Sequence, residues 1–146
     1  MNDLKVLILL QISGFPEFCP ANSLLLSANY PLMNIDAIHL WEKVKVIALD
    51  LPETFEKPCH GTPAMYVGKK LLCRLREDDE SLALYNHERH IWIDRNSHIF
   101  FITDHYLNHP MLLIHLSKVS KADLETLMMN SWKIRAGKKL LKSYEG

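Results

Sequence analysis

The chain has 146 residues, a length typical of one globular domain that can bury a core of its own. Its 17 basic residues balance its 17 acidic residues, and this net charge of zero counts against a dedicated nucleic-acid binder, which usually carries a basic excess. Three cysteines without a C-x-x-C pair exclude a disulfide framework and a zinc knuckle, and they favour free thiols in a reducing cytoplasm. No apolar run approaches the roughly 20 residues that a membrane-spanning helix needs.

Residues 1–33 differ in composition from the rest of the chain. They carry one basic and two acidic residues, and they combine an apolar run with three prolines and a leucine triplet. Three interpretations stay open: a weak signal peptide, an additional helix or strand docked on the domain, or upstream sequence translated in frame, with Met33 as the natural start. We favour the third, because the resemblance to a known family that is given below begins at Asn34. The predicted domain is therefore 34–146, preceded by an atypical extension.

A helix is predicted to begin after Asn34, whose side chain can cap it. Apolar residues follow at helical spacing until Leu51-Pro52, where the helix should end because a proline disfavours helical backbone in the residue before it. Residues 53–62 are polar and interrupted by proline. This segment is therefore predicted to be an extended connection or an edge strand.

A β-hairpin is predicted next. Ala64–Val67 should form a short strand, Gly68-Lys69 a turn and residues 71–76 the second strand. Regular alternation along that second strand predicts two faces, made respectively of Leu71, Cys73 and Leu75 and of Leu72, Arg74 and Arg76. An acidic turn over residues 77–80 then leads to a third strand, Ser81–Tyr85.

The second half of the chain is predicted to add a short helix over 86–96, strands over 99–103 and 111–116, and a last helix. Asn86 and Ser120 are the expected helix caps, and Trp132 lies in the apolar stripe of the last helix, so it is expected in the core. Both strands are apolar at successive positions, so protein should cover both of their faces. The complete order is α–βββ–α–ββ–α, an α+β fold.

This order and a set of short motifs resemble the MmcQ/YjbR family over about residues 34–141. The resemblance implies a two-layer α+β sandwich over an antiparallel sheet, similar to secretion chaperones, and a DNA-binding function in which hairpins form a double wing. One departure is His109, at a position that is usually aromatic in that family. The motifs that carry the resemblance are Leu51-Pro52, Gly61-Thr62-Pro63-Ala64, Gly68-Lys69, Arg74-Leu75-Arg76, Phe101, His105-Tyr106, Pro110 and Trp132…Arg135-Ala136…Lys138.

Seven basic residues are candidate nucleic-acid ligands under this resemblance. Lysines at a hairpin tip can reach phosphates as mobile charges, and arginines behind them can bind phosphate bidentately. Competing explanations are ordinary solvation of a hairpin tip, neutralisation of Arg76 by the neighbouring acidic turn, and stabilisation of a helix C-terminus by the last lysines. The candidates are Lys69, Lys70, Arg74, Arg76, Lys138, Lys139 and Lys142.

Metal-binding and catalytic patterns are weak. His105 and His109 lie in an expected turn, and His115 should point elsewhere from its strand, so convergence on a metal ion is not expected. Cys59 and His60 are adjacent, and neighbours on extended backbone point to opposite faces. The sequence shows no Ser/His/Asp grouping and no phosphate-cradling glycine loop. We therefore expect a non-enzymatic protein without a metal or cofactor.

Two functional hypotheses follow. The first is a small cytoplasmic protein that binds DNA weakly and without sequence choice through the seven basic residues. The second is a protein-interaction module that pairs with itself as a homodimer, through an exposed sheet face or edge, with the apolar residues 111–114 as a candidate surface. Zero net charge favours the second and the family resemblance favours the first, which is the function that we predict. Neither hypothesis involves a membrane or a small-molecule substrate.

Overall fold

The computed structural model describes residues 33–146, so the interpretations of residues 1–32 lie outside the described part of the chain. The chain divides into two units between His39 and Leu40, and the unit Leu40–Gly146 contains the whole described sheet. The described elements, in chain order, are α2 (Ile35–Leu49), β1 (Thr54–Glu56), β2 (Ala64–Val67), β3 (Lys70–Leu75), β4 (Ser81–Tyr85), α3 (Arg89–Arg95), β5 (Phe100–Phe101), the 3-10 helix η2 (Asp104–Tyr106), β6 (Met111–His115), α4 (Lys121–Arg135) and α5 (Lys138–Glu145).

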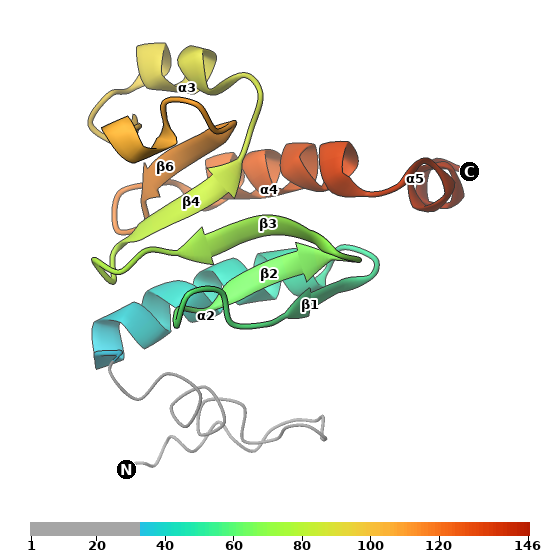
Figure 1. Cartoon of the computed structure of the whole chain (residues 1–146), viewed down its shortest axis with the longest axis horizontal. Helices are drawn as coiled ribbons and strands as arrows, with labels where there is room; N and C mark the ends of the chain where they lie inside the picture. The colour runs from blue at the N-terminus through green and yellow to red at the C-terminus, as the bar shows by residue number, and fades with distance from the viewer. Residues whose placement is uncertain (1–32) are drawn as a thin grey trace. The chain divides into compact units, whose positions relative to one another are not determined.

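The strands form one antiparallel sheet of six, in the order β1-β2-β3-β4-β6-β5 (Figure 1). The predicted α+β class, with an antiparallel sheet, is confirmed. Within residues 53–62, Thr54–Glu56 form β1, which among the described strands pairs only with β2, so the expected edge strand is confirmed as well. The strand expected over 99–103 is much shorter, because the chain turns into η2 directly after Thr103.

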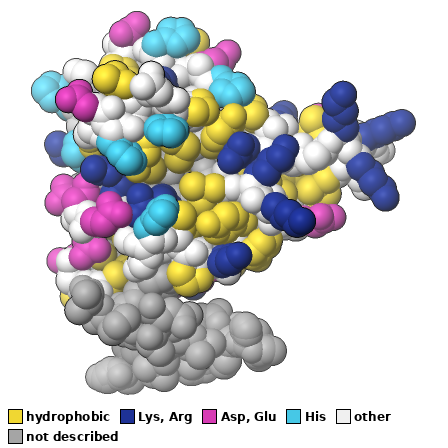
Figure 2. Space-filling model, in the orientation of Figure 1, with side chains coloured by type: hydrophobic (Ala, Val, Ile, Leu, Met, Phe, Trp, Pro, Cys, Tyr) yellow, Lys and Arg dark blue, Asp and Glu magenta, His cyan; other side chains and the backbone are white. Residues whose placement is uncertain are grey.

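Helix α4 and the part of α2 from Leu40 onward lie on one face of the sheet (Figure 1). Trp41 and Trp132 are fully buried on this side, as are Cys73 and Leu84, which pair across β3 and β4. Among the described elements no helix covers the opposite face of β3 and β4, which is turned to the viewer in Figures 1 and 2. Hydrophobic side chains are visible in the middle of that open face (Figure 2).

Two of the predicted helix caps are confirmed and one is wrong. Asn34 Oδ1 accepts a hydrogen bond from Ala37 N at 2.8 Å, and Ser120 Oγ accepts one from Asp123 N at 3.1 Å. Asn86 Oδ1 accepts instead from Glu88 N, and α3 begins only at Arg89. The Asn86 side chain therefore stabilises the turn before the helix. Hydrogen bonds from a short polar side chain to nearby backbone groups compete with helix formation, and they make Asn favourable in turns.

The last helix of the predicted pattern is two helices. Ala136 and Gly137 adopt extended backbone, with ψ of 135° and 157°, and they separate α4 from α5. Extended backbone at two successive residues ends the helical hydrogen-bond ladder, so α5 starts a new helix with its own termini. The observed order is therefore α–ββββ–α–ββ–α–α.

A β-bulge overturns part of the predicted alternation along β3. Met65 pairs with Cys73 and Tyr66 pairs with Leu71, so Leu72 is an extra residue on β3. A bulge shifts the side-chain alternation by one residue. Leu71 therefore packs against a cluster on the open face that includes Ala83, the residue that pairs with Arg74. Leu71 shares a face with Arg74, and the prediction that it shares one with Cys73 is wrong.

Candidate functional site

Lys69 and Lys70 lie at the tip of the β2–β3 hairpin, as predicted. Gly68 takes a positive φ of 58° in the turn, and Val67 pairs with Lys70 across it. Both lysine side chains are exposed. Neither forms an ion pair with another residue of the described chain.

The other three candidate lysines lie on α5 and are also exposed. Lys138 and Lys139 stand in the first turn of this helix and Lys142 in its last turn. The helix dipole disfavours positive charge at a helix N-terminus. The expected stabilisation of a helix C-terminus by lysine therefore applies to Lys142 and not to Lys138 and Lys139. The correction follows directly from the helix break before Lys138.

The hairpin tip and α5 are neighbours in space. A cavity of about 440 Å³ lies between them, and its lining includes Gly68 of the turn and Lys139 of α5. Figure 2 shows Lys and Arg side chains gathered at the end of the molecule that holds these two elements. The structure thus brings together five of the seven predicted residues, from segments about 70 positions apart: Lys69, Lys70, Lys138, Lys139 and Lys142.

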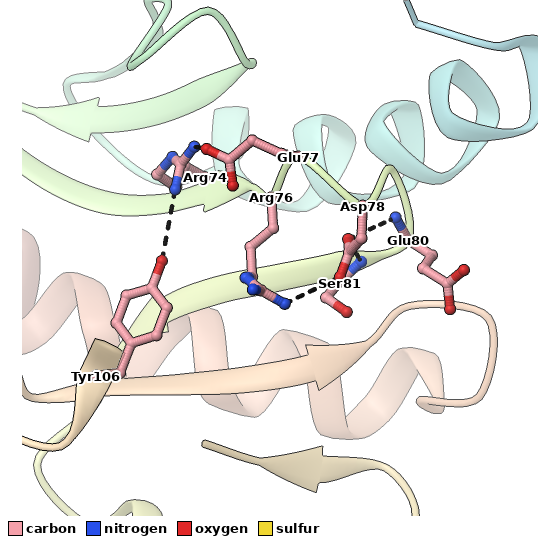
Figure 3. A network of polar contacts seen from close by, with 7 residues as sticks. All are labelled: Arg74, Arg76, Glu77, Asp78, Glu80, Ser81 and Tyr106. Atoms are coloured by element: carbon pink, nitrogen blue, oxygen red, sulfur yellow. Dashed lines mark hydrogen bonds and ion pairs between the residues drawn. The ribbon is translucent and has the colours of Figure 1, made fainter. Parts of the chain in front are cut away.

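Arg74 and Arg76 do not belong to this group. Arg74 is 7% exposed; its Nη1 donates to the Tyr106 hydroxyl at 3.4 Å, and its Nη2 forms an ion pair with Glu77 (Figure 3). Arg76 Nη1 forms an ion pair with Asp78 at 2.9 Å. The prediction that both arginines present outward phosphate ligands is wrong for the buried Arg74, and the predicted neutralisation of Arg76 by the acidic turn is confirmed.

Two carboxylates of the acidic turn, those of Glu77 and Asp78, are held in their charged forms. The hydrogen bond from Arg74 lowers the pKa of Glu77. Burial acts to raise the pKa of Asp78, but the backbone N–H groups of Glu80 and Ser81, which donate to Asp78 Oδ1 at 3.0 and 2.8 Å, outweigh it and lower the pKa overall. The turn therefore keeps negative charge beside both arginines at neutral pH, which weakens any attraction that they offer to phosphate.

A second cavity, of about 290 Å³, lies over the open face of the sheet. Arg135 reaches it from the end of α4: its Nε donates to the carbonyl of Leu71 at 2.9 Å, and its guanidinium lies 3.8 Å from the centre of the Tyr85 ring. The sequence pattern gave no sign of this position, because the contact joins residues 64 positions apart. The lining residues are Cys59, His60, Leu71, Arg74, Tyr85, His105, Tyr106, His109, Pro110, Met111 and Arg135.

The loop between η2 and β6 forms one wall of this cavity and is fastened by Arg89. The guanidinium of Arg89 donates to four backbone carbonyls of the loop and of the start of β6, at 2.5 to 3.0 Å. Sequence reasoning missed this residue too, since an arginine near a short helix carries no signal for a loop 17 to 22 positions away. The accepting carbonyls belong to Tyr106, Leu107, His109 and Met111.

The histidines for which a metal site was considered lie apart from one another. The rings of His105 and His109 are 6.0 Å apart between centroids, whereas His115 stacks on Phe101 at 4.4 Å. Within residues 33–146 no group of three His, Cys, Asp or Glu side chains is placed to hold a metal ion. Likewise, none of the described helices is long and apolar enough to cross a bilayer.

The described cysteines differ in environment. Cys73 is fully buried in β3, and burial raises the pKa of its thiol to about 12. Cys59 is partly exposed beside the second cavity. Because the thiolate is the reactive form, iodoacetamide at pH 8 is expected to label Cys59 in the native protein and to label Cys73 only after unfolding, as mass spectrometry of the peptides would show. Native labelling of Cys73 at the rate of Cys59 would contradict this burial.

Comparison with known proteins adds no assignment: no family model, curated protein or solved structure matches the chain. The MmcQ/YjbR resemblance and the functions that it implies therefore stay predictions. The features available for a functional proposal are the lysine cluster, the neutralised arginines and the second cavity.

Proposed function

We propose that this protein binds nucleic acid without sequence choice, through the lysine cluster made of Lys69, Lys70, Lys138, Lys139 and Lys142. The observation that carries the proposal is that exposed lysines of a hairpin tip and of a separate helix lie on either side of one cavity. Gly68 and Lys139 line it from the two sides, together with one acidic residue, Glu53. No ion pair with a described residue offsets their charge. Such a group offers mobile positive charges to a phosphate backbone.

The chemistry of the cluster sets the expected specificity. Lysine ammonium groups act on phosphates as point charges, whereas sequence is read by hydrogen bonds to base edges. Arg74 and Arg76, which would supply a more directional contact, are engaged with the acidic turn. We therefore expect weak binding that depends strongly on salt and little on sequence.

The test is binding of the full chain to a labelled random DNA duplex, measured by fluorescence anisotropy. With about four phosphates contacted, affinity is expected to fall by about 10²-fold between about 50 and 200 mM salt. Lys69→Glu with Lys70→Glu, and separately Lys138→Glu with Lys139→Glu, should each weaken binding by at least about tenfold.

A matched control is the double reversal Lys118→Glu with Lys121→Glu. Both residues are exposed, and Lys121 begins α4, whose 15 residues place it about 22 Å from the end that leads to α5. This variant carries the same change in net charge, so it should retain most of the affinity if the cluster is the site. Equal losses in all three variants would mean that only total charge matters, and absence of binding at low salt would refute the proposal.

The self-pairing hypothesis loses its candidate surface in the structure. Met111 is 8% exposed, at the edge of the second cavity, and the three residues after it are fully buried, so this strand offers no apolar surface large enough to pair with a second copy. The expectation that protein covers both faces of this strand is confirmed, and we do not propose a homodimer.

A further inference from the structure

The cavity over the open sheet face exists because β3 and β4 separate at one end. Their ladder runs from Leu75↔Leu82 to Cys73↔Leu84 and then stops. Beyond that point Arg135 bridges the two strands, donating to the backbone of Leu71 on β3 and lying over the ring of Tyr85 on β4. The bulge at Leu72 contributes to the separation, since it bends β3 away from regular pairing.

Arg135 is held in position through only part of its guanidinium group, and its terminal nitrogens keep unused hydrogen-bond donors. Its Nε is used by Leu71, and stacking on Tyr85 fixes the plane of the guanidinium. No carboxylate of the described chain pairs with it, and none lines the cavity. The two terminal nitrogens therefore present a planar pair of donors, which matches the two oxygens of a carboxylate.

Two further features of the lining favour an anion with an apolar body. Arg74 is more than nine-tenths buried and lines the cavity, and its Nε lacks a hydrogen-bond partner among the described residues. Leu71, Tyr85 and Met111 supply apolar and aromatic surface beside the two guanidinium groups. A volume of about 290 Å³ lies just below the range of about 300–1,000 Å³ for drug-sized ligands, so it suits a smaller molecule.

We propose that this cavity binds a small organic acid with a planar apolar body of one or two rings. Its carboxylate pairs with the terminal nitrogens of Arg135, and its ring lies against Tyr85, Leu71 and Met111. The site is distinct from the lysine cluster, which lies at the hairpin tip and α5. An inorganic anion would satisfy Arg135 alone and would leave the apolar lining uncovered.

The test is a two-dimensional amide NMR titration of the full chain with benzoate, with 1-naphthoate and with the neutral isostere benzamide. Saturable chemical-shift changes are expected at Leu71, Tyr85 and the Arg135 Nε–H. The two acids should bind with a dissociation constant of about 1 mM or tighter, and benzamide should bind at least about tenfold more weakly. This comparison uses the unaltered protein, so it does not depend on the folding of any variant. Inorganic phosphate is added as a competitor and should not displace the acids at equal concentration.

The matched variants are Arg135→Gln and Lys133→Gln, which remove one positive charge each from the last turn of α4. Arg135→Gln should weaken acid binding at least about tenfold, whereas Lys133→Gln and the Lys69→Glu, Lys70→Glu variant should leave it unchanged. Four results would each overturn the proposal. They are equal binding of benzoate and benzamide, unchanged acid binding by folded Arg135→Gln, displacement of the acids by phosphate, and absence of saturable shifts at these residues.

Discussion

Replacing Trp132 with alanine is expected to lower the free energy of unfolding by about 3–5 kcal/mol, the range for removing a buried aromatic side chain. Trp132 is fully buried between α4 and the sheet. Its indole N–H donates to the carbonyl of Pro52 at 2.9 Å, and its ring makes an edge contact with Tyr144 at 4.9 Å between centroids. The substitution leaves a cavity and removes the donor that holds the chain just before β1.

Urea denaturation followed by circular dichroism measures this loss, and two further variants divide it. Tyr144→Ala removes the edge contact from a residue that is 45% exposed, and it should cost no more than about 1.5 kcal/mol. Trp132→Phe keeps most of the ring but leaves the Pro52 carbonyl without its donor, which should cost about 1–2 kcal/mol. A loss below about 1 kcal/mol for Trp132→Ala would show that this part of the core is loosely packed.

Trp132 also illustrates what the sequence can predict. Its burial followed from helical spacing, and the caps Asn34 and Ser120 followed from the preference of a short polar side chain for the N–H groups of a first turn. The Gly68-Lys69 turn is equally local. These features depend on residues within a few positions of each other, so a single sequence is sufficient to predict them.

The failures have a different origin. Alternation along β3 placed Leu71 with Cys73, but the extra residue Leu72 arises from pairing with β2 and has no mark in the spacing of apolar residues. The break between α4 and α5 was missed because Ala136 is a good helix former and Gly137 is only one weak interruption. The helix break places Lys138 at the start of a helix. The burial of Arg74 has another cause, its contacts with Glu77 and with the distant Tyr106.

The net charge of zero results from an uneven distribution of charge, which differs between the start and the end of β3. At the end of β3, Arg74 and Arg76 meet Glu77 and Asp78, so positive and negative charges cancel locally. At its start, the lysine cluster forms no ion pair with a described residue, although Glu53 lines the same cavity. A balanced composition therefore does not exclude a phosphate-binding surface, because the ion pairs of the described chain engage other basic residues, such as Arg74 and Lys45, and none of the five clustered lysines.

Replacing Arg89 with alanine is expected to have the second large effect, because it removes one cation that serves four backbone carbonyls. Hydrogen bonds to charged donors contribute more than neutral ones, and the carbonyls of Tyr106 and Met111 lie in a partly buried region where water replaces the donor poorly. We expect a loss of about 3 kcal/mol in the free energy of unfolding and faster amide hydrogen exchange across residues 104–110.

Two controls separate the geometry of Arg89 from its charge. Arg89→Lys keeps the charge, but a single ammonium group cannot reach carbonyls that Arg89 contacts through two nitrogens, so it should recover less than half of the lost stability. His90→Ala alters an exposed neighbour on α3 and should change stability by no more than about 0.5 kcal/mol.

Arg89→Ala should also weaken benzoate binding, although Arg89 does not line the cavity over the open face. Tyr106 and His109 line it, and their backbone carbonyls are held by Arg89. Without Arg89 the loop no longer holds one position in the unbound protein. Part of the binding free energy of the ligand is then used to order the loop, so the measured affinity falls. If stability falls while hydrogen exchange in the loop stays slow, the contacts around Tyr106 hold the wall without Arg89, and the cavity is built by packing rather than by this arginine.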